Sequence, residues 1–175
     1  MASGSFHSNT GVHLNLYCEW SSTTNVAGNY STVTMRTYLK HYSLYVGARS
    51  DTYVKCNGEN YTYNAPAISY GGSSKITTTL LSSKSFTVYH NSDGTKSITL
   101  EAGWRFSGTY SGVSIGWITC SATVTLDNIP RASSISSITS SVTVDGSNSV
   151  TVNISRNSTA FTHKVKFVFG SYSQE

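Results

Sequence analysis

A histidine, an aspartate and several hydroxyl side chains fall close together in residues 90–95, which read HNSDGT. These residue types could hold a metal ion or carry out acid–base chemistry. A metal centre needs further ligands, and calcium needs several carboxylates at alternating positions, whereas Asp93 is the only carboxylate in the stretch. Asn, Asp and Gly also favour tight chain reversals, in which Gly94 could adopt a left-handed conformation. We therefore interpret these residues as a turn and not as a catalytic or metal centre.

The titratable residues elsewhere are dispersed along the sequence. The histidines are His7, His13, His41, His90 and His163, and the carboxylates are Glu19, Asp51, Glu59, Asp93, Glu101, Asp127, Asp145 and Glu175. No two histidines have a spacing that places them together on one strand face. Two carboxylates could act as a glycosidase pair only if the fold happened to bring them together. We therefore expect no enzyme activity, no metal site and no cofactor.

The three cysteines, Cys18, Cys56 and Cys120, are an odd number and have no CxxC spacing. Cys18 alternates with apolar residues along residues 12–20, and Cys120 does so along residues 118–126. Both are interpreted as buried free thiols in a reducing compartment, with a disulfide or a metal role as the alternative.

Aromatic side chains provide the candidates for a binding surface. The candidate residues are Tyr17, Arg36, Tyr38, Tyr42, Tyr45, Tyr110 and Trp117. The first three are expected to point outward from strands, the next three fall at expected strand ends or loops, and the tryptophan is out of phase with the apolar series that follows it. Aromatic rings stack on the C–H faces of sugars, but they also enrich protein interfaces and stabilise cross-strand pairs. Assembly contacts are the favoured interpretation, ahead of sugar stacking and of a purely structural role.

The composition favours β-structure with a nearly uncharged, hydroxyl-rich surface. Charged residues make up 11% of the chain, against about 25% in an average globular domain. In contrast, the chain contains 32 Ser and 23 Thr, and threonine together with the 12 tyrosines favours strands.

The net charge of +4 arises from a scarcity of acids, because the basic residues are scattered singly from Arg36 to Lys166. A nucleic-acid-binding surface would cluster them, so no nucleic-acid partner is expected. No apolar run is long enough to span a membrane, and residues 1–6 lack the basic and apolar regions of a signal peptide. We expect synthesis in a cytoplasm without a signal peptide, and no membrane insertion.

Apolar and polar residues alternate with a period of two along most of the chain up to residue 130, as expected for half-buried strands. Strands are predicted over residues 12–20, 76–90, 98–106 and 117–126, a long or bent strand over residues 30–46, and a hairpin of two strands over residues 53–63. Seven or eight short strands without a helix predict an all-β fold. Residues 1–130 are therefore expected to form an antiparallel β-sandwich, either immunoglobulin-like or jelly-roll-like.

Turn residues indicate how these strands are connected. Asn57-Gly58 is the strongest short-range hairpin signal in the chain, and residues 90–95 are predicted to be the tip of a second hairpin. Residues 21–29 are expected to be a polar loop and residues 64–75 to be irregular. Three glycines at positions 103, 108 and 112 are interpreted as a flexible connection.

The composition changes after residue 130. Residues 131–137 are interpreted as a Ser-rich linker. Further strands are expected over residues 138–144, 150–154 and 161–169, with a turn at 145–148. Three strands in about 40 residues rarely support a core of their own. Residues 138–175 are therefore interpreted as the start of a second β-sandwich module, or as a segment that borrows surface from a neighbour.

Several stretches together resemble a known protein family. They are MASGSF at residues 1–6, WSS at 20–22 followed by GNYSTVT at 28–34, HNSDGTKSI at 90–98 and VTLDNIPRAS at 124–133. Over about residues 1–135, and in this order, the chain resembles minor structural proteins of siphophages, the tailed phages with long non-contractile tails, that infect Gram-positive bacteria. The resemblance implies a virion protein of the tail tip, fibre or baseplate with a part in host attachment, and it brings no catalytic residues.

Two functions follow as hypotheses. The first is a non-enzymatic virion protein whose partners are other phage tail subunits, with assembly into a homo-oligomer. The second is a carbohydrate-binding module that recognises host cell-wall or capsular polysaccharide, so that a host-surface glycan is a further candidate partner.

Overall fold

The structure is a computed structural model, and it describes residues 1–70, 75–139, 150–156, 163–169 and 172–174. Every regular element in these residues is a β-strand, and every strand pair is antiparallel. The predicted all-β, sandwich-like fold is therefore confirmed. No helix in these ranges has the length and apolar character needed to cross a membrane.

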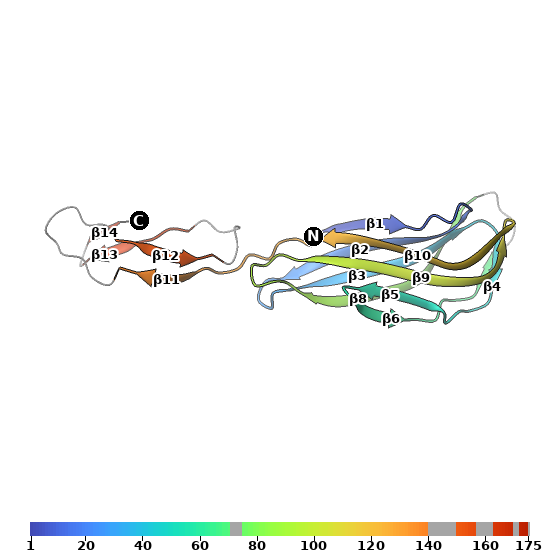
Figure 1. The fold of residues 1–175 in the computed structure, drawn as a ribbon, viewed down its shortest axis with the longest axis horizontal. Coiled ribbons are helices and arrows are strands. Elements are labelled where there is room, and N and C mark those ends of the chain that lie inside the picture. The colour runs from blue at the N-terminus through green and yellow to red at the C-terminus, as the bar shows by residue number, and fades with distance from the viewer. Residues whose placement is uncertain (71–74, 140–149, 157–162, 170–171, 175) are drawn as a thin grey trace.

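Two four-stranded sheets form the larger part of the molecule (Figure 1). The first has the order β1-β2-β3-β8, in which β1 is Ser3–His7, β2 is Leu14–Asn25, β3 is Tyr30–His41 and β8 is Thr77–Tyr89. The second has the order β10-β9-β5-β6, in which β5 is Thr52–Cys56, β6 is Glu59–Thr62, β9 is Ser97–Tyr110 and β10 is Val113–Thr125. A short sheet at one end pairs β4 (Leu44–Val46) with β7 (Ile68–Tyr70).

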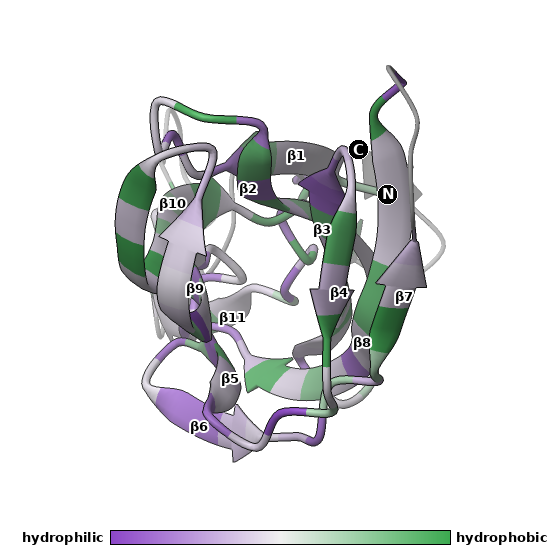
Figure 2. Cartoon of the chain, turned by 90° about the vertical axis from the view of Figure 1, so that its right-hand side faces the viewer, coloured by the Kyte–Doolittle hydropathy of each residue, from purple (hydrophilic) through white to green (hydrophobic). Residues whose placement is uncertain are grey.

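The sheets bury their facing sides against each other, and the view along the long axis shows them enclosing the interior (Figure 2). On β2 the buried residues alternate with partly or fully exposed ones, because successive side chains of a strand point to opposite faces. The largest fully buried apolar side chains come from both sheets: Leu14, Leu16, Val33, Met35, Leu39, Val54, Ile98, Leu100, Trp104 and Ile118. Trp20 and Trp104 are buried, whereas Phe106 is only partly buried.

Residues 90–95 turn the chain as predicted, but they connect the two sheets and are not a hairpin tip. β8 pairs with β3 in the first sheet, whereas β9 pairs with β5 and β10 in the second. Within the turn Gly94 has φ 84° and its N–H donates to the Asn91 carbonyl at 2.9 Å. The hairpin prediction was wrong because turn chemistry is local, whereas the core determines which partners the flanking strands find.

The hairpin at Asn57-Gly58 is confirmed. Both residues have positive φ, 51° and 87°, and they join β5 to β6 as a two-residue loop. Ser111 and Gly112, with φ 50° and 79°, join β9 to β10 in the same way. Such paired positive φ values match the twist of the strands on either side.

Several strands start or end at other residues than expected, and the predicted strand 30–46 is divided between β3 and β4, which belong to different sheets. β2 continues to Asn25 because the backbone of this stretch pairs in register with the start of β3, so the predicted loop 21–29 is reduced to its last residues. β7 lies within the stretch expected to be irregular, and β1 was not predicted. Gly103 and Gly108 lie inside β9, so the predicted flexible connection is in fact a 14-residue strand followed by the turn at Gly112.

Beyond one end of the sandwich lie two short two-stranded sheets (Figure 1). They pair β11 (Ser134–Ile138) with β12 (Val152–Ser155), and β13 (Phe167–Phe169) with β14 (Tyr172–Gln174). β11 overlaps the stretch interpreted as a linker, because its hydroxyl-rich residues pair with β12. Most of the predicted strand 138–144 and the whole predicted turn 145–148 lie outside the described residues.

His41, at the end of β3, makes stability depend on pH. Its side chain is fully buried, with Nδ1 3.0 Å from the Tyr42 carbonyl oxygen and Nε2 3.1 Å from Thr79 Oγ1. A carbonyl oxygen only accepts, so Nδ1 carries the proton and Nε2 accepts from the threonine hydroxyl. Burial lowers the pKa of His41 below its ordinary 6.5.

The unfolded chain therefore binds a proton at this histidine that the folded chain does not, so stability is full above the unfolded pKa and is lost as pH falls below it. We expect the free energy of unfolding in urea to fall between about pH 7 and pH 5, by about 1.4 kcal/mol for each unit of pKa depression. His41→Asn should flatten this dependence. His13→Asn, which removes an exposed histidine, should keep it, and an unchanged slope in His41→Asn would contradict the assignment.

Candidate functional site

The outward face of β2 and β3 brings together three of the candidate residues. The strands pair with Tyr17 opposite Tyr38 and with Glu19 opposite Arg36. The inward neighbour Cys18 is fully buried, so the alternation of the strand places Tyr17 and its partners on the outer side of the sheet. We call the residues Tyr17, Glu19, Arg36, Tyr38 and Lys40 the Tyr17 face.

Direct contacts hold the Tyr17 face together. The Lys40 Nζ lies 3.6 Å from the centroid of the Tyr17 ring, and the Tyr17 and Tyr38 rings are 6.2 Å apart. The Tyr38 hydroxyl donates to Glu19 Oε2 at 3.2 Å. Partial desolvation and the Glu19 carboxylate raise the pKa of Tyr38, which keeps its hydroxyl a donor. The rings are thus positioned by cross-strand contacts before any ligand binds.

Two depressions meet at Tyr17. The first, of ≈ 370 Å³, is lined by Ser3, Gly4, Ser5, Tyr17, Glu19, Trp20, Ser21, Thr34 and Arg36. The second, of ≈ 540 Å³, is lined by His7, Ser8, Asn9, His13, Asn15, Leu16, Tyr17, Lys40 and Ile76. Hydroxyl side chains and the opposite charges of Glu19 and Arg36 surround the first depression. The Lys40 ammonium group, the amides of Asn9 and Asn15 and the imidazoles of His7 and His13 surround the second. An aromatic ring flanked by such groups can contact the flat face of a ligand while polar atoms bind its edges.

Sequence reasoning missed the contribution of β1 to this site. Ser3, Ser5 and His7 line the depressions, but the stretch from Ser3 to His7 shows no apolar alternation that would have predicted a strand. β1 fits beside β2 because Gly4 faces Trp20 in register, where an added Cβ would come within 2.9 Å of Trp20 Nε1. A glycine inside a strand often marks a place where another part of the chain approaches closely, so Gly4 was the signal in the sequence that could have predicted β1.

Tyr42 and Tyr110 contact each other, but Tyr110 is not a surface residue. The Tyr42 N–H donates to the Tyr110 hydroxyl at 3.1 Å, and the Tyr110 side chain is only 8% exposed. The expectation that Tyr110 belongs to a binding surface is therefore wrong, because its hydroxyl satisfies a backbone donor at the end of β3. Tyr42 packs against His13, with ring centroids 4.2 Å apart, at the border of the second depression.

The last two candidates lie away from the Tyr17 face. Tyr45 is 68% exposed on β4 in the small sheet. Trp117 is 50% exposed on β10 in the second sheet and packs against Tyr53, with ring centroids 5.7 Å apart. The candidates thus divide among separate surfaces, and one of these surfaces carries Tyr17, Arg36 and Tyr38.

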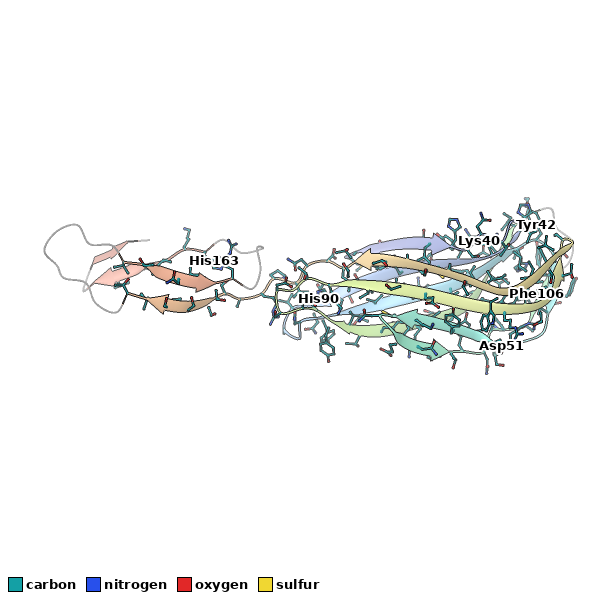
Figure 3. The ribbon with its side chains drawn as sticks, viewed as in Figure 1. Lys40, Tyr42, Asp51, His90, Phe106 and His163 are labelled. Atoms are coloured by element: carbon teal, nitrogen blue, oxygen red, sulfur yellow. The ribbon has the colours of Figure 1, made fainter. Side chains whose placement is uncertain are left out.

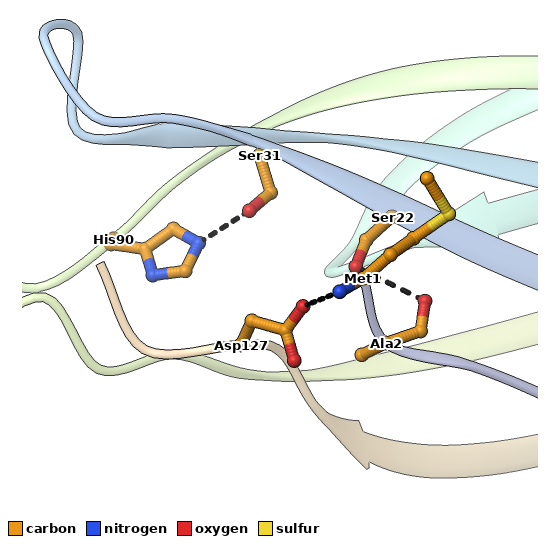
Figure 4. A network of polar contacts seen from close by, with 6 residues as sticks. All are labelled: Met1, Ala2, Ser22, Ser31, His90 and Asp127. Atoms are coloured by element: carbon orange, nitrogen blue, oxygen red, sulfur yellow. Dashed lines mark hydrogen bonds and ion pairs between the residues drawn. The ribbon is translucent and has the colours of Figure 1, made fainter.

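His90, the residue that first raised the question of catalysis, is part of a structural network. Its Nε2 lies 2.8 Å from Ser31 Oγ (Figure 4). Its Nδ1 lies 2.8 Å from the Gly94 carbonyl oxygen. Ser31 is fully buried and the group beyond Nδ1 is a carbonyl, so the pair has no access for a substrate. The contacts of His90 stabilise the turn between the sheets. This turn lies at the end of the sandwich opposite Lys40 and Tyr42 (Figure 3). At the same end, the Met1 amino group lies 2.6 Å from Asp127 Oδ2 (Figure 4).

No cluster of three or more metal-ligating side chains occurs in the part of the chain that the structure describes. The three cysteines are buried and unbridged, which agrees with the interpretation of Cys18 and Cys120 from the sequence.

A family model described as a siphovirus protein of unknown function (DUF859) matches residues 1–175. The chain belongs to this siphovirus family. The match includes residues 136–175, beyond the part that carried the resemblance in the sequence. Comparison with curated proteins and with solved structures gave no match.

Proposed function

We propose that the chain is a structural protein of the siphophage tail, in the tail tip, fibre or baseplate, and that it assembles with other tail subunits through its sheet surfaces. The observation that carries this proposal is membership of a siphovirus family over the whole chain. A β-sandwich with a sparsely charged, hydroxyl-rich exterior suits a protein that is packed against other subunits. In this role the chain binds its partners and does not transform them.

Exposed apolar side chains support assembly. On the sandwich they include Leu80 of β8 and Trp117 of β10, both on strands at the edge of a sheet. On the C-terminal sheets Ile135, Ile138 and Val168 are each more than half exposed. Apolar side chains of this size at a surface mark contact sites, and open strand edges offer backbone groups for pairing. We propose a homo-oligomer, or a ring with other tail subunits, that covers these residues.

Quantitative mass spectrometry of purified virions tests the proposal. The chain is expected in a fixed copy number relative to the major tail protein, and that ratio should survive a second round of gradient purification. A chain that is abundant in the infected lysate but lost from purified particles would contradict a structural role.

We propose host-glycan recognition by the Tyr17 face as a second function, which can coexist with the first. The supporting observation is the meeting of two depressions at one aromatic ring that contacts Lys40 and Tyr38. The partner class is cell-wall or capsular polysaccharide of a Gram-positive host.

Tyr17→Ala tests this second function. Loss of the ring is expected to weaken binding of the full chain to purified wall polysaccharide by about 1 to 2 kcal/mol, which is roughly a 5- to 30-fold rise in Kd. Isothermal titration calorimetry measures the change, and thermal unfolding verifies that the variant is folded. Tyr45→Ala, which removes an exposed tyrosine ring from the small sheet, away from the Tyr17 face, should leave Kd unchanged. Equal losses in both variants, or no measurable binding by the wild type, would refute a site at Tyr17.

A further inference from the structure

Two thiols from opposite sheets meet in the interior of the sandwich. Cys18 is on β2 of the first sheet and Cys120 is on β10 of the second. Their sulfur atoms are 3.7 Å apart, and Cys18 is fully buried while Cys120 is 8% exposed. The two strands lie close together, since Cα atoms of β10 come within 8 Å of Cα atoms of β2. A disulfide bond of about 2.05 Å needs the sulfur atoms to approach by about 1.7 Å.

We propose that Cys18 and Cys120 form an intrachain disulfide once the protein has left the reducing cytoplasm of the host, and that the bond fastens the two sheets to each other. A siphovirus protein is made in a bacterial cytoplasm, where thiols stay reduced, and the particle then persists outside the cell, where disulfides are stable. The third cysteine, Cys56, lies on β5 and takes no part.

The oxidant is a low-molecular-weight disulfide. Cys120 is the thiol with some exposure and lies on an edge strand, so it reacts first. Its thiolate, formed by loss of the thiol proton, attacks one sulfur of the small disulfide, which forms a mixed disulfide and releases one small thiol. Cys18 then loses its proton and attacks Cys120 Sγ, which releases the second small thiol. The two protein thiols give up two electrons, and the small disulfide takes them up.

In the folded chain the surroundings of the pair make this reaction slow. The hydrogen bond with Cys120 and burial raise the pKa of Cys18 far above its ordinary value. Because the thiolate is the reactive form, this raised pKa slows thiol–disulfide exchange at Cys18. Once formed, the bond closes a loop of about 100 residues and lies out of reach of external thiols, so reduction is slow as well.

The test uses the full chain and its Cys56→Ser variant. Each is refolded in a buffer of reduced and oxidised glutathione, which removes the limit that burial sets on the rate, and is then alkylated, digested and analysed by mass spectrometry. The expected product is a peptide pair linked through Cys18 and Cys120, with loss of two hydrogen atoms, in both proteins. Cys56 of the wild type should remain alkylated.

Thermal unfolding supplies the second readout, because the oxidised and reduced forms of one variant differ only in the bond. The oxidised Cys56→Ser variant is expected to melt roughly 10 °C above the same variant after reduction. The proposal is overturned if Cys18 and Cys120 both remain alkylatable after redox refolding, if Cys56 is the cross-linked partner, or if oxidation leaves Tm unchanged. These outcomes do not depend on tail location or glycan binding, so they are distinguishable from a failure of the proposed functions.

Discussion

Replacing Gly94 with alanine is expected to destabilise the protein by about 3 kcal/mol or more, one of the two largest effects that the structure predicts for a single substitution. Gly94 has φ 84°, a left-handed conformation that residues with a Cβ rarely adopt. An added Cβ would also lie 1.8 Å from the Ile129 carbonyl oxygen, which is a backbone atom and cannot rotate away. The strain of the conformation and the clash therefore act together.

Gly58→Ala is the matched control. Gly58 has a similar φ of 87°, but an added Cβ would meet nothing within 4 Å. Only the conformational strain applies, so the expected loss is about 1 to 2 kcal/mol. Urea unfolding of the two variants side by side measures the difference, and equal losses would show that the contact between Gly94 and Ile129 is not as tight as described.

The Gly94 substitution also tests how the segment after β10 is held against the sandwich. The Ile129 N–H donates to the Gly94 carbonyl at 3.0 Å, and the Leu126 N–H donates to the Lys96 carbonyl at 2.9 Å. The turn between the sheets thus holds the segment that leads from β10 to β11. We expect Gly94→Ala to increase amide exchange in residues 126–131 before it affects the centre of β3.

Trp104→Ala is expected to reduce the free energy of unfolding by about 3 to 5 kcal/mol. Trp104 is fully buried on β9, and its ring stacks on Phe106 with centroids 5.8 Å apart and planes 7° from parallel. Its indole N–H has no hydrogen-bond partner among the described residues, so Trp104→Phe should cost less than Trp104→Ala.

Trp117→Ala is the control for the same loss of an indole. Trp117 is half exposed on the neighbouring strand, so its removal is expected to cost about 1 kcal/mol or less. Chemical denaturation with fluorescence and far-UV detection measures both variants. A similar loss at the two positions would contradict the assignment of Trp104 to the core and of Trp117 to the surface.

The period of two in the sequence was enough to predict the fold class and the outward position of Tyr17 and Tyr38. It also predicted which side chains of β2 point into the core, because each apolar residue from Leu14 to Trp20 alternates with a polar one. Asn57-Gly58 predicted its hairpin because a two-residue hairpin turn requires positive φ and these two residue types adopt it readily.

The remaining errors have a common physical origin, which is that strand partners are distant in sequence. Residues 90–95 have the chemistry of a hairpin turn, yet the core separates β8 and β9 into different sheets. Ser21–Asn25 and Ser3–His7 have no apolar alternation, and they become strands only because β3 and β2 supply hydrogen-bond partners. Tyr110 is buried for the same reason, since the backbone donor that it satisfies is at Tyr42, far away in the chain.

The most direct measurement of the central claim is a cryo-electron microscopy map of the purified siphophage tail that carries this chain. The account predicts density for the β1–β10 sandwich at the tail tip, fibre or baseplate, in a fixed symmetric copy number, with the exposed residues of β10 and of the C-terminal sheets covered by neighbouring subunits. A complete tail map with no density that accommodates the sandwich would contradict the account.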